Sequence, residues 1–333
     1  MNEARTVEGL GEEGIIALIA RACPTTGPGM VIGIGDDAAV LDATAGHTVV
    51  TTDLLVEGSH FDFRYSTPGD VGRKALAVNL SDVAAMGAVP GPFFLSLGLP
   101  ATSEVLAVER FATALGDLAR STGAWLAGGD TVAAPAGWVV SITLHGKCQA
   151  VPVRRAGASP GHTLWVSGTL GEAAAGLRWL TEGRTETTAT GPWLARHRRP
   201  EPRLALGRWL AEHGLASAML DLSDGLATDA PRLATASACG LEINLDRLPI
   251  APTLIEVFGR AEARLLALAG GEDFELLFAV PAERQGALAG APMAVTQIGR
   301  VTPAGMRWLD AGQEQTAPHA VEHHFPLPHR PIP

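Results

Sequence analysis

The chain has 333 residues, which is long enough for two domains of ordinary size and a large buried core. Hydrophobic residues make up 47% of the sequence and charged residues 18%, a balance that excludes a disordered chain. Lysine and arginine total 25 against 35 aspartates and glutamates, and the formal charge of −10 argues against a nucleic-acid partner, whose phosphates need local positive charge.

Helical and strand-like patterns alternate along the first half of the chain. Short runs rich in β-branched residues lie between turn residues, and longer stretches have the character of helices. In chain order we predict a helix over 12–23, strands over 30–34, 38–42 and 47–53, a helix over 70–86, a strand over 93–99, a helix over 104–121, and strands over 124–127 and 138–146. Gly87 suits the end of the second helix.

A segment rich in proline, glycine and arginine, residues 151–162, marks the predicted boundary between two domains, 1–150 and 151–333. Beyond it the patterns predict a strand over 163–168, helices over 171–180, 202–213 and 224–238, and strands over 241–245, 274–280 and 294–301. Strands and helices mix in both halves, and several strands follow one another as in hairpins. We therefore expect α+β domains and not one doubly wound sheet.

The cysteines and the N-terminal residues indicate the compartment. Cys23, Cys148 and Cys239 show no CxxC spacing, and an odd number fits no disulfide framework, so we expect reduced thiols. The N-terminal residues lack the basic and apolar regions of a signal peptide. The longest uncharged stretch, 83–103, contains three prolines and three glycines and is unsuited to span a membrane. A soluble cytoplasmic protein without a membrane partner is expected.

The common nucleotide and hydrolase motifs are missing from the sequence. It contains no GxxxxGK[ST] loop, no complete dinucleotide-binding fingerprint, and no HExxH, GxSxG or protein-kinase motif. The chain has only two lysines, Lys74 and Lys147, so a lysine-dependent mechanism has few candidates.

Aspartates recur instead beside apolar or glycine-rich segments. These segments are 33–41, 51–62, 74–87, 127–131, 221–229 and 270–278. The sharpest case is Asp82, because its helix otherwise carries apolar residues and has Asn79 one turn earlier on the same face. A carboxylate buried there without a partner is strongly destabilising. Each aspartate alone also fits a turn or a helix N-cap, as Asp224 would before the helix that follows it.

If the acidic segments converge, their charges need counter-ions. Two carboxylates ~4 Å apart repel each other by about 4 kcal/mol at an effective dielectric constant of ~20. Ligand sets made of oxygen alone favour Mg²⁺ over zinc, and carboxylate-bound Mg²⁺ usually serves substrate phosphates. These residues therefore indicate a Mg²⁺-dependent enzyme that acts on a nucleotide without a P-loop.

Seven stretches in a fixed order carry the most specific pattern of the chain. They are GIGDDAAVL, TTDLLVEGSHFD, KALAVNLSDVAAMGAVP, AGGDT, RRAGASPGH, DLSDGLATD and GGEDFELLF, which span residues 33–278. This combination resembles the thiamine-monophosphate kinase family, a branch of the aminoimidazole-ribonucleotide-synthetase-like superfamily. GGD or DLSDG alone would be a weak signal.

The resemblance implies an α+β chain of two α/β domains. The N-terminal domain, 1–150, is implied to bind ATP and Mg²⁺, and its mixed sheet to form a β-barrel across a homodimer. The C-terminal domain, 151–333, would complete the nucleotide and substrate sites. The implied reaction is direct in-line transfer of the ATP γ-phosphoryl group to thiamine monophosphate, assisted by several Mg²⁺ ions, to give thiamine diphosphate.

The resemblance also assigns roles to individual residues of this sequence. The implied Mg²⁺ ligands are Asp37, Thr51, Thr52, Asp53, Asp82, Asp130, Asp221 and Asp224. The implied catalytic residues are Asp53, Asp130 and Arg155, and the implied ATP-binding residues are Gly129, Asp130, Arg155 and Ser223. His60, Glu272 and Phe325 match positions that contact the thiamine substrate.

Several of these residues also fit ordinary structural roles. Thr51 and Thr52 suit any strand, Arg155 suits a solvated linker, His60 a structural contact, and Phe325 a tether for the chain end. The sequence departs from the family in two places: no bulky aromatic precedes the terminal HF element within 320–325, and 121–122 lack the tyrosine common in relatives. Two alternatives stay open, namely another ATP-dependent synthetase of the superfamily and a non-catalytic nucleotide-binding regulator.

Overall fold

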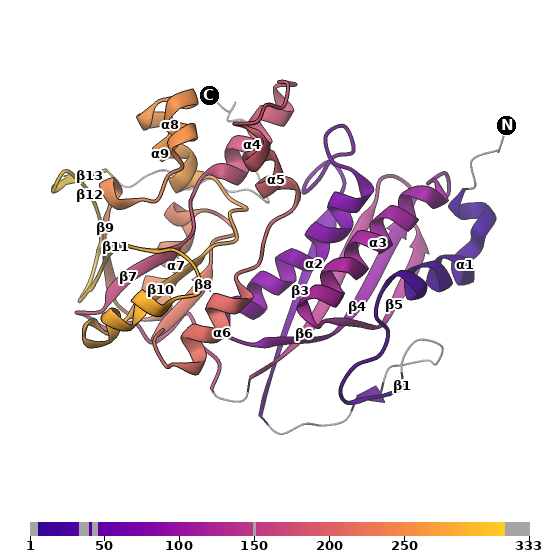
Figure 1. Ribbon diagram of the computed structural model, residues 1–333, viewed down its shortest axis with the longest axis horizontal. Helices are drawn as coiled ribbons and strands as arrows, with labels where there is room; N and C mark the ends of the chain where they lie inside the picture. Colours follow the sequence, from indigo (N-terminus) through magenta and orange to yellow (C-terminus); the bar gives the residue numbers. More distant parts are fainter. Residues whose placement is uncertain (1–5, 33–39, 42–45, 149–150, 317–333) are drawn as a thin grey trace. The chain divides into compact units, whose positions relative to one another are not determined.

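The computed structural model describes residues 6–32, 40–41, 46–148 and 151–316 (Figure 1). The chain divides into two compact units. The first comprises Met1–Pro152 and Arg198–Glu212, and the second comprises Val153–His197 and His213–Pro333. The chain thus enters the second unit, returns to the first for one helical segment, and then completes the second.

A mixed sheet is the centre of the first unit. The elements of this unit are α1 (Val7–Ala22), β1 (Met30–Ile32), β2 (Val40–Leu41), β3 (His47–Val56), α2 (Pro68–Ala85), β4 (Val89–Leu99), α3 (Val105–Thr122), β5 (Trp125–Ala133), β6 (Val139–Cys148) and α6 (Leu204–Glu212). Among the described residues, the sheet has the strand order β3-β6-β4-β5. Only β4 and β5 run parallel, and β1 and β2 form a separate antiparallel pair.

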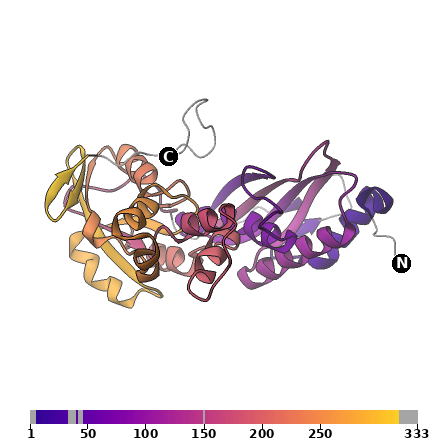
Figure 2. The same cartoon turned by 90° about the horizontal axis from the view of Figure 1, so that it is seen from above.

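Helices α2 and α3 cover one face of this sheet, and the other face is open within the described unit (Figures 1 and 2). Burial alternates along β3 accordingly. Val49 and Leu55 are buried against the helices, whereas Val50 and Leu54 on the opposite face are 57% and 52% exposed. The helix-covered face holds the core, in which a fully buried leucine such as Leu80 contributes about 1.5–3 kcal/mol.

Helix α2 is well defined at its start and closely packed at its end. Thr67 and Asp70 form a reciprocal capping box, and Pro68 occupies the first turn, where its missing N–H is not needed. Near the other end α6 crosses α2 so closely that a Cβ at Gly207 would lie 2.0 Å from the carbonyl oxygen of Ala84. Glycine is required at this crossing, and the contact explains why α6 belongs to the first unit.

A larger mixed sheet forms the second unit. Its elements are β7 (Thr163–Ser167), α4 (Glu172–Thr181), α5 (Gly191–Arg198), β8 (Ala218–Asp221), α7 (Leu226–Ala236), β9 (Gly240–Asn244), η1 (Leu245–Arg247), α8 (Pro252–Phe258), α9 (Arg260–Ala269), β10 (Leu276–Val280), η2 (Ala282–Gly290), β11 (Val295–Thr302), β12 (Met306–Asp310) and β13 (Gln313–Gln315). In the described ranges the strand order is β13-β12-β9-β11-β7-β10-β8, antiparallel except between β12 and β9.

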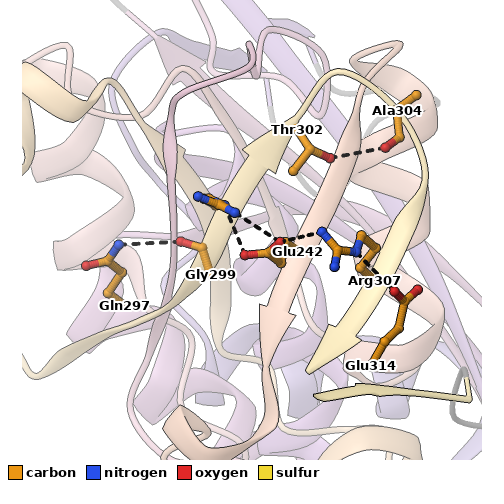
Figure 3. Close-up of polar contacts among 8 residues, drawn as sticks. Glu242, Gln297, Gly299, Thr302, Ala304, Arg307 and Glu314 are labelled. Atoms are coloured by element: carbon orange, nitrogen blue, oxygen red, sulfur yellow. Dashed lines mark hydrogen bonds and ion pairs between the residues drawn. The ribbon is translucent and has the colours of Figure 1, made fainter. Parts of the chain in front are cut away.

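A charged network lies on the β9–β11–β12 part of this sheet (Figure 3). Glu242 of β9 is buried between Arg300 of β11, at 2.9 Å, and Arg307 of β12, at 3.0 Å. Arg307 also contacts Glu314 of β13 at 3.2 Å. Because these residues face one another across neighbouring strands, their ion pairs connect four strands of the sheet.

The predicted α+β class, with mixed sheets and helices in two units, is confirmed. Two predicted strand ends are wrong, because β3 continues to Val56 and β5 to Ala133. Asp53 and Asp130 therefore lie within strands and not at strand ends. At Gly129, a Cβ would lie 1.9 Å from the carbonyl oxygen of Leu95 on β4. This glycine permits close strand pairing.

Other boundaries and elements also differ from prediction. Helix α1 begins at Val7, five residues before the predicted start. Strand β4 begins at Val89, before two prolines, and its pairing with β6 is irregular between Pro90 and Phe93. The α-helices and strands missed by the sequence patterns are β8, α5, α8, α9, β12 and β13. Most are too short to show a clear period. No helix in the described ranges has both the length and the hydropathy needed to cross a membrane.

Candidate active site

Three consecutive residues of β3, Thr51, Thr52 and Asp53, are predicted metal ligands, and the strand separates their side chains. Thr51 Oγ1 donates a hydrogen bond to Oδ2 of Asp82 on α2, at 2.5 Å. Asp53 lies two residues further along, so its side chain shares this helix-covered face. Thr52 points to the open face, where Thr143 Oγ1 donates to its hydroxyl at 3.1 Å. The three side chains therefore cannot all bind one ion.

Helix α2 adds a second oxygen one turn before Asp82. Asn79 is fully buried, and its Nδ2 donates to the carbonyl oxygen of Ala75 at 3.0 Å. Its Oδ1 has no hydrogen-bond partner among the described residues. A buried amide oxygen in this state costs about 1–3 kcal/mol. Together with the carboxylate of Asp82 and the hydroxyl of Thr51, it gives a donor set of hard oxygens, which fits Mg²⁺.

Asp130 lies on β5 with its side chain on the open face of the sheet. It pairs in register with Ser96 of β4, which is also exposed, and its Oδ1 accepts a hydrogen bond from the backbone N–H of Thr131 at 2.9 Å. The preceding Gly129 pairs with Leu95, which is buried on the opposite face. The carboxylate of Asp130 is thus presented away from the helices.

The sheet places Asp53 and Asp130 far apart within one chain. In the described sheet β3 and β5 are the two edge strands, and β6 and β4 lie between them. Three strand spacings of about 4.8 Å separate these edges by roughly 14 Å. The two carboxylates also face opposite sides, so one chain does not bring this predicted pair together.

His60 follows β3 and is held by its neighbours. The backbone N–H of Val56 donates to its Nδ1 at 3.1 Å, so the proton of the neutral ring is on Nε2. Lys74, a buried residue of α2, donates from Nζ to the backbone carbonyl oxygen of His60 at 3.0 Å. The ring is therefore set to donate from Nε2, as contact with a phosphate oxygen would require.

Two predicted metal ligands of the second unit follow β8. Asp221 is the buried last residue of that strand. Asp224 Oδ2 accepts a hydrogen bond from Arg232 at 2.5 Å, and Arg232 also contacts Asp229 at 2.7 Å. Burial raises the pKa of Asp229 although that arginine opposes the shift. The N-cap of α7 is Gly225, without a side-chain bond, so Asp224 is not the helix cap that its sequence context suggested.

The GGED motif forms a loop over 270–275 that pairs with the segment after β8. The backbone N–H of Glu272 donates to the carbonyl oxygen of Ser223 at 2.8 Å, and that of Phe274 donates to Leu222 at 2.9 Å. Glu272 and Phe274 have φ values of 68° and 49°, in the left-handed region. Each such conformation costs about 1–3 kcal/mol and is typical of functional sites. His197 Nδ1 lies 2.8 Å from Oε2 of Glu272.

Asp273 is buried in the middle of this loop. Its carboxylate accepts hydrogen bonds from the N–H groups of Gly171, at 2.7 Å, and Ala173, at 3.3 Å. Burial nevertheless raises its pKa to about 8, and the nearby carboxylate of Glu275 adds to the shift, while Arg196 opposes it. The loop is therefore bound to the start of α4 through Asp273, a buried acid.

Arg155 lies in the segment that opens the second unit. Its side chain is exposed, and its backbone carbonyl oxygen accepts a hydrogen bond from Ser237 Oγ at 2.9 Å. The same hydroxyl accepts from the N–H groups of Gly157 and Ala158, both at 3.2 Å. The backbone is thereby anchored while the guanidinium group is presented to solvent.

Two predicted site residues, Asp37 and Phe325, lie outside the described residues. Within the described ranges, no group of three or more histidine, cysteine, aspartate or glutamate side chains is arranged to hold a metal ion. The oxygen donors found at β3 and α2 include a hydroxyl and an amide, and water or substrate phosphate usually completes the coordination of Mg²⁺ in such sites.

Comparison with known proteins identifies the family. Residues 35–148 match the model of the AIR synthase related protein N-terminal domain, and 159–307 match that of its C-terminal domain. The chain is 41% identical over 271 residues to thiamine-monophosphate kinase of Salmonella typhimurium, covering 80% of this chain and 81% of that protein. The chain belongs to the thiamine-monophosphate kinase family. The family predicted from the seven sequence stretches is thus confirmed.

Solved structures of thiamine-monophosphate kinases have the same fold. The enzyme from Stenotrophomonas maltophilia K279a is 37% identical with a TM-score of 0.78, covering 91% of this chain and 96% of that chain. The structure described as AaThiL complexed with AMPPCP and TMP is 34% identical with a TM-score of 0.74, covering 95% and 97%. The predicted two-domain architecture of the family is therefore confirmed.

The structure also reveals residues around loop 270–275 that sequence reasoning missed. Glu275 is fully buried and accepts a hydrogen bond from Ser167 Oγ at 2.5 Å, and its other oxygen lies 3.5 Å from Arg196. Arg196 and His197 come from the last turn of α5, far from the loop in sequence. The GGEDFE motif signals three neighbouring acids, but no local pattern identifies their partners.

Proposed function

We propose that this protein transfers the γ-phosphoryl group of ATP to the phosphate of thiamine monophosphate, forming thiamine diphosphate and ADP. The observation that carries the proposal is the match over 95% of the chain to a relative whose structure is described as a complex with AMPPCP and TMP. The 41% identity to a thiamine-monophosphate kinase supports the same reaction. We expect the protein in the cytoplasm, since its cysteines are free thiols, which suit a reducing compartment.

The chemistry of the acceptor limits what the protein has to supply. The phosphate oxygen of thiamine monophosphate is already anionic at neutral pH, so no strong general base is needed. Catalysis then depends on aligning donor and acceptor and on neutralising the charge of the phosphates. Residues that orient phosphates and cations are therefore the ones whose replacement should matter most.

We propose that Mg²⁺ supplies this neutralisation when bound. In the first unit Asp53 and Asp82 would hold it, with oxygen from Thr51 and the unpaired amide oxygen of Asn79 nearby. The full proposed ligand set is Asp37, Thr51, Thr52, Asp53, Asp82, Asp130, Asp221 and Asp224. Its oxygen-only chemistry is the support for Mg²⁺ over softer metals.

We assign ATP contacts to Gly129, Asp130, Arg155 and Ser223. The exposed guanidinium of Arg155, on an anchored backbone, suits a phosphate because its planar fork offers paired donors. The backbone of Ser223 is fixed by the N–H of Glu272. Loop 270–275 and the segment after β8 are therefore held together, which supports neighbouring roles in substrate and nucleotide binding.

We assign the thiamine substrate to His60, Glu272 and Phe325. The Nε2–H of His60 suits the substrate phosphate, and the carboxylate of Glu272 suits the cationic ring of thiamine. The left-handed backbone at Glu272 supports a functional role, because such strain persists where the surroundings fix a site. Phe325 is proposed for ring stacking on the basis of the family motif alone.

A homodimer would join the two separated edges of the first sheet. If β3 of one copy pairs with β5 of another, Thr52 and the partner subunit's Asp130 lie on the same face of neighbouring strands. The open face carries exposed apolar side chains, including Val50 and Leu54, which a closed β-barrel would bury. The main support for this arrangement is that β3 and β5 are the two edge strands of the described sheet. Their pairing would make Asp53 and the partner subunit's Asp130 neighbours in strand order, with the two side chains on opposite faces of the joined sheet.

The test of the proposed function is direct. The purified chain is incubated with thiamine monophosphate, ATP and Mg²⁺, and thiamine diphosphate and ADP are quantified by chromatography. We expect equal amounts of both products and their loss with EDTA. ADP without thiamine diphosphate would indicate another acceptor, and bound ATP without either product would indicate a non-catalytic nucleotide-binding protein.

A further inference from the structure

The last turn of α5 places a buried histidine behind Glu272. The side chain of His197 is 4% exposed, and its Nδ1 lies 2.8 Å from Oε2 of Glu272, whose side chain is 28% exposed. The glutamate therefore reaches solvent while the imidazole that supports it does not. We propose that His197 is a positioning residue that orients the Glu272 carboxylate toward the cationic ring of the thiamine substrate. This inference rests on the proposed function.

The backbone around Glu272 is already fixed, so its side chain is the part that remains to be ordered. The backbone N–H is bonded to Ser223, and φ is 68°. A glutamate side chain loses up to about 2 kcal/mol of rotamer entropy when it is fixed. A buried partner at 2.8 Å limits where the carboxylate can lie before the substrate arrives, which leaves more of the contact energy for binding.

The three acids of loop 270–275 have separate partners, and the partner of Glu272 differs in kind. Asp273 is bonded to the N–H groups of Gly171 and Ala173, and Glu275 faces a guanidinium group and a serine hydroxyl. Glu272 has an imidazole as its ion-pair partner. An imidazole can donate an N–H while uncharged, whereas a guanidinium always brings a positive charge. With an uncharged imidazole, the Glu272–His197 pair can therefore keep a net negative charge for a cationic substrate.

The geometry leaves the contact to be completed by the substrate. The Nδ1–Oε2 distance is that of a hydrogen bond, but the N–H does not point along it well enough to form one. Contacts of this kind in binding sites often become aligned only when the ligand is present. A small rotation of the carboxylate toward the thiazolium would bring it into line with the imidazole.

Three substitutions at His197 separate this role from simple packing. His197→Asn keeps an amide nitrogen near the position of Nδ1, His197→Gln moves it toward the position of Nε2, and His197→Leu removes it. We expect the Leu and Gln variants to raise KM for thiamine monophosphate about tenfold, because they lose the hydrogen bond to the charged carboxylate that aligns when the substrate binds. The Asn variant should stay within about threefold of wild type. KM for ATP should change less than about twofold in all three.

A double substitution tests whether His197 acts through Glu272. In a Glu272→Ala background, His197→Leu should raise KM for thiamine monophosphate no further, because the group it orients is gone. Three results would each overturn the inference. The first is an equal KM for thiamine monophosphate in the Asn and Gln variants, and the second is a parallel rise in KM for ATP. The third is additive effects on KM for thiamine monophosphate in the double variant. If the Leu variant does not fold, the inference is tested by comparing KM for thiamine monophosphate between the Asn and Gln variants. A wild-type protein that makes no thiamine diphosphate would overturn the proposed function itself.

Discussion

Loop 270–275 and the charged network around Glu242 belong to the same unit. Both contain a buried acid beside an arginine, but they are built differently. Glu242 lies in a regular strand between Arg300 and Arg307 (Figure 3). The side chains of the two arginines are 62% and 46% exposed. The loop has left-handed backbone at Glu272 and Phe274 and takes its partners from α4 and α5.

We infer from this difference that Glu242 serves the fold, whereas Glu272 has the proposed role in the reaction. The Glu242 network adds ion pairs to a sheet that is already paired, and exposed partners keep each pair weak. The loop instead maintains a costly backbone conformation to present one acid to solvent. Replacing an acid of the first kind should change stability and not activity, and replacing one of the second kind should do the reverse.

Asp53→Asn should have the largest effect on activity. It applies the comparison between structural and functional acids to an aspartate of the first unit. The amide removes a negative charge from the proposed Mg²⁺ ligand set while keeping the shape of the side chain. We expect thiamine diphosphate formation to fall at least about 100-fold, with a melting temperature within about 2 °C of wild type. Near-normal turnover in this variant would contradict the metal assignment.

Mixing two inactive variants tests whether the site is shared between subunits. Asp53→Asn and Asp130→Asn are each expected to be inactive, because each removes one proposed ligand. If each site of a dimer needs Asp53 of one subunit and Asp130 of the other, an equal mixture that is unfolded and refolded together should regain about a quarter of wild-type activity, since half of its dimers have one intact site. No recovery, with mixed dimers demonstrated, would place both residues in the same chain's site.

Glu272→Ala should weaken binding of the thiamine substrate selectively. The carboxylate is proposed to face a cation, so its loss should raise KM for thiamine monophosphate by about 10-fold to 100-fold and KM for ATP by less than about threefold. The two constants are measured by varying one substrate at a saturating level of the other. A larger effect on ATP would mean that loop 270–275 serves the nucleotide.

The raised pKa of Asp273 predicts that the stability of the protein depends on pH. Its pKa is raised from the ordinary 3.8 to about 8 in the folded protein, so the folded state binds the proton more tightly than the unfolded chain. The stabilisation is complete below about pH 4 and is lost as the pH rises through 8. Between pH 6 and 9 the melting temperature of wild type should therefore fall more than that of Asp273→Asn. Parallel curves for the two proteins would contradict the shifted pKa.

Glu242→Gln should have the smallest effect. The amide keeps the shape of the side chain but removes the charge that pairs with Arg300 and Arg307. We expect a loss of about 1 kcal/mol in the free energy of unfolding and unchanged KM values for both substrates. Denaturant unfolding gives the first quantity. A change in either KM would show that this cluster is not purely structural.

The family and the α+β class follow from the sequence alone, because both depend on local patterns. The order of seven motifs specifies the family, and oxygen donors without cysteine or histidine indicate a hard cation. Local periodicity also located most of the longer helices and strands. It missed β8 and α8, which are four and seven residues long, because segments of that length show no clear period.

The tertiary structure decided how those residues meet. Alternation along β3 put Thr51 and Thr52 on opposite faces, and the strand order put Asp53 and Asp130 on opposite edges. The packing of α6 returned part of the chain to the first unit, and the end of α5 brought His197 to Glu272 across 74 intervening residues. Such pairings depend on the register and packing of distant segments, which no local sequence pattern encodes.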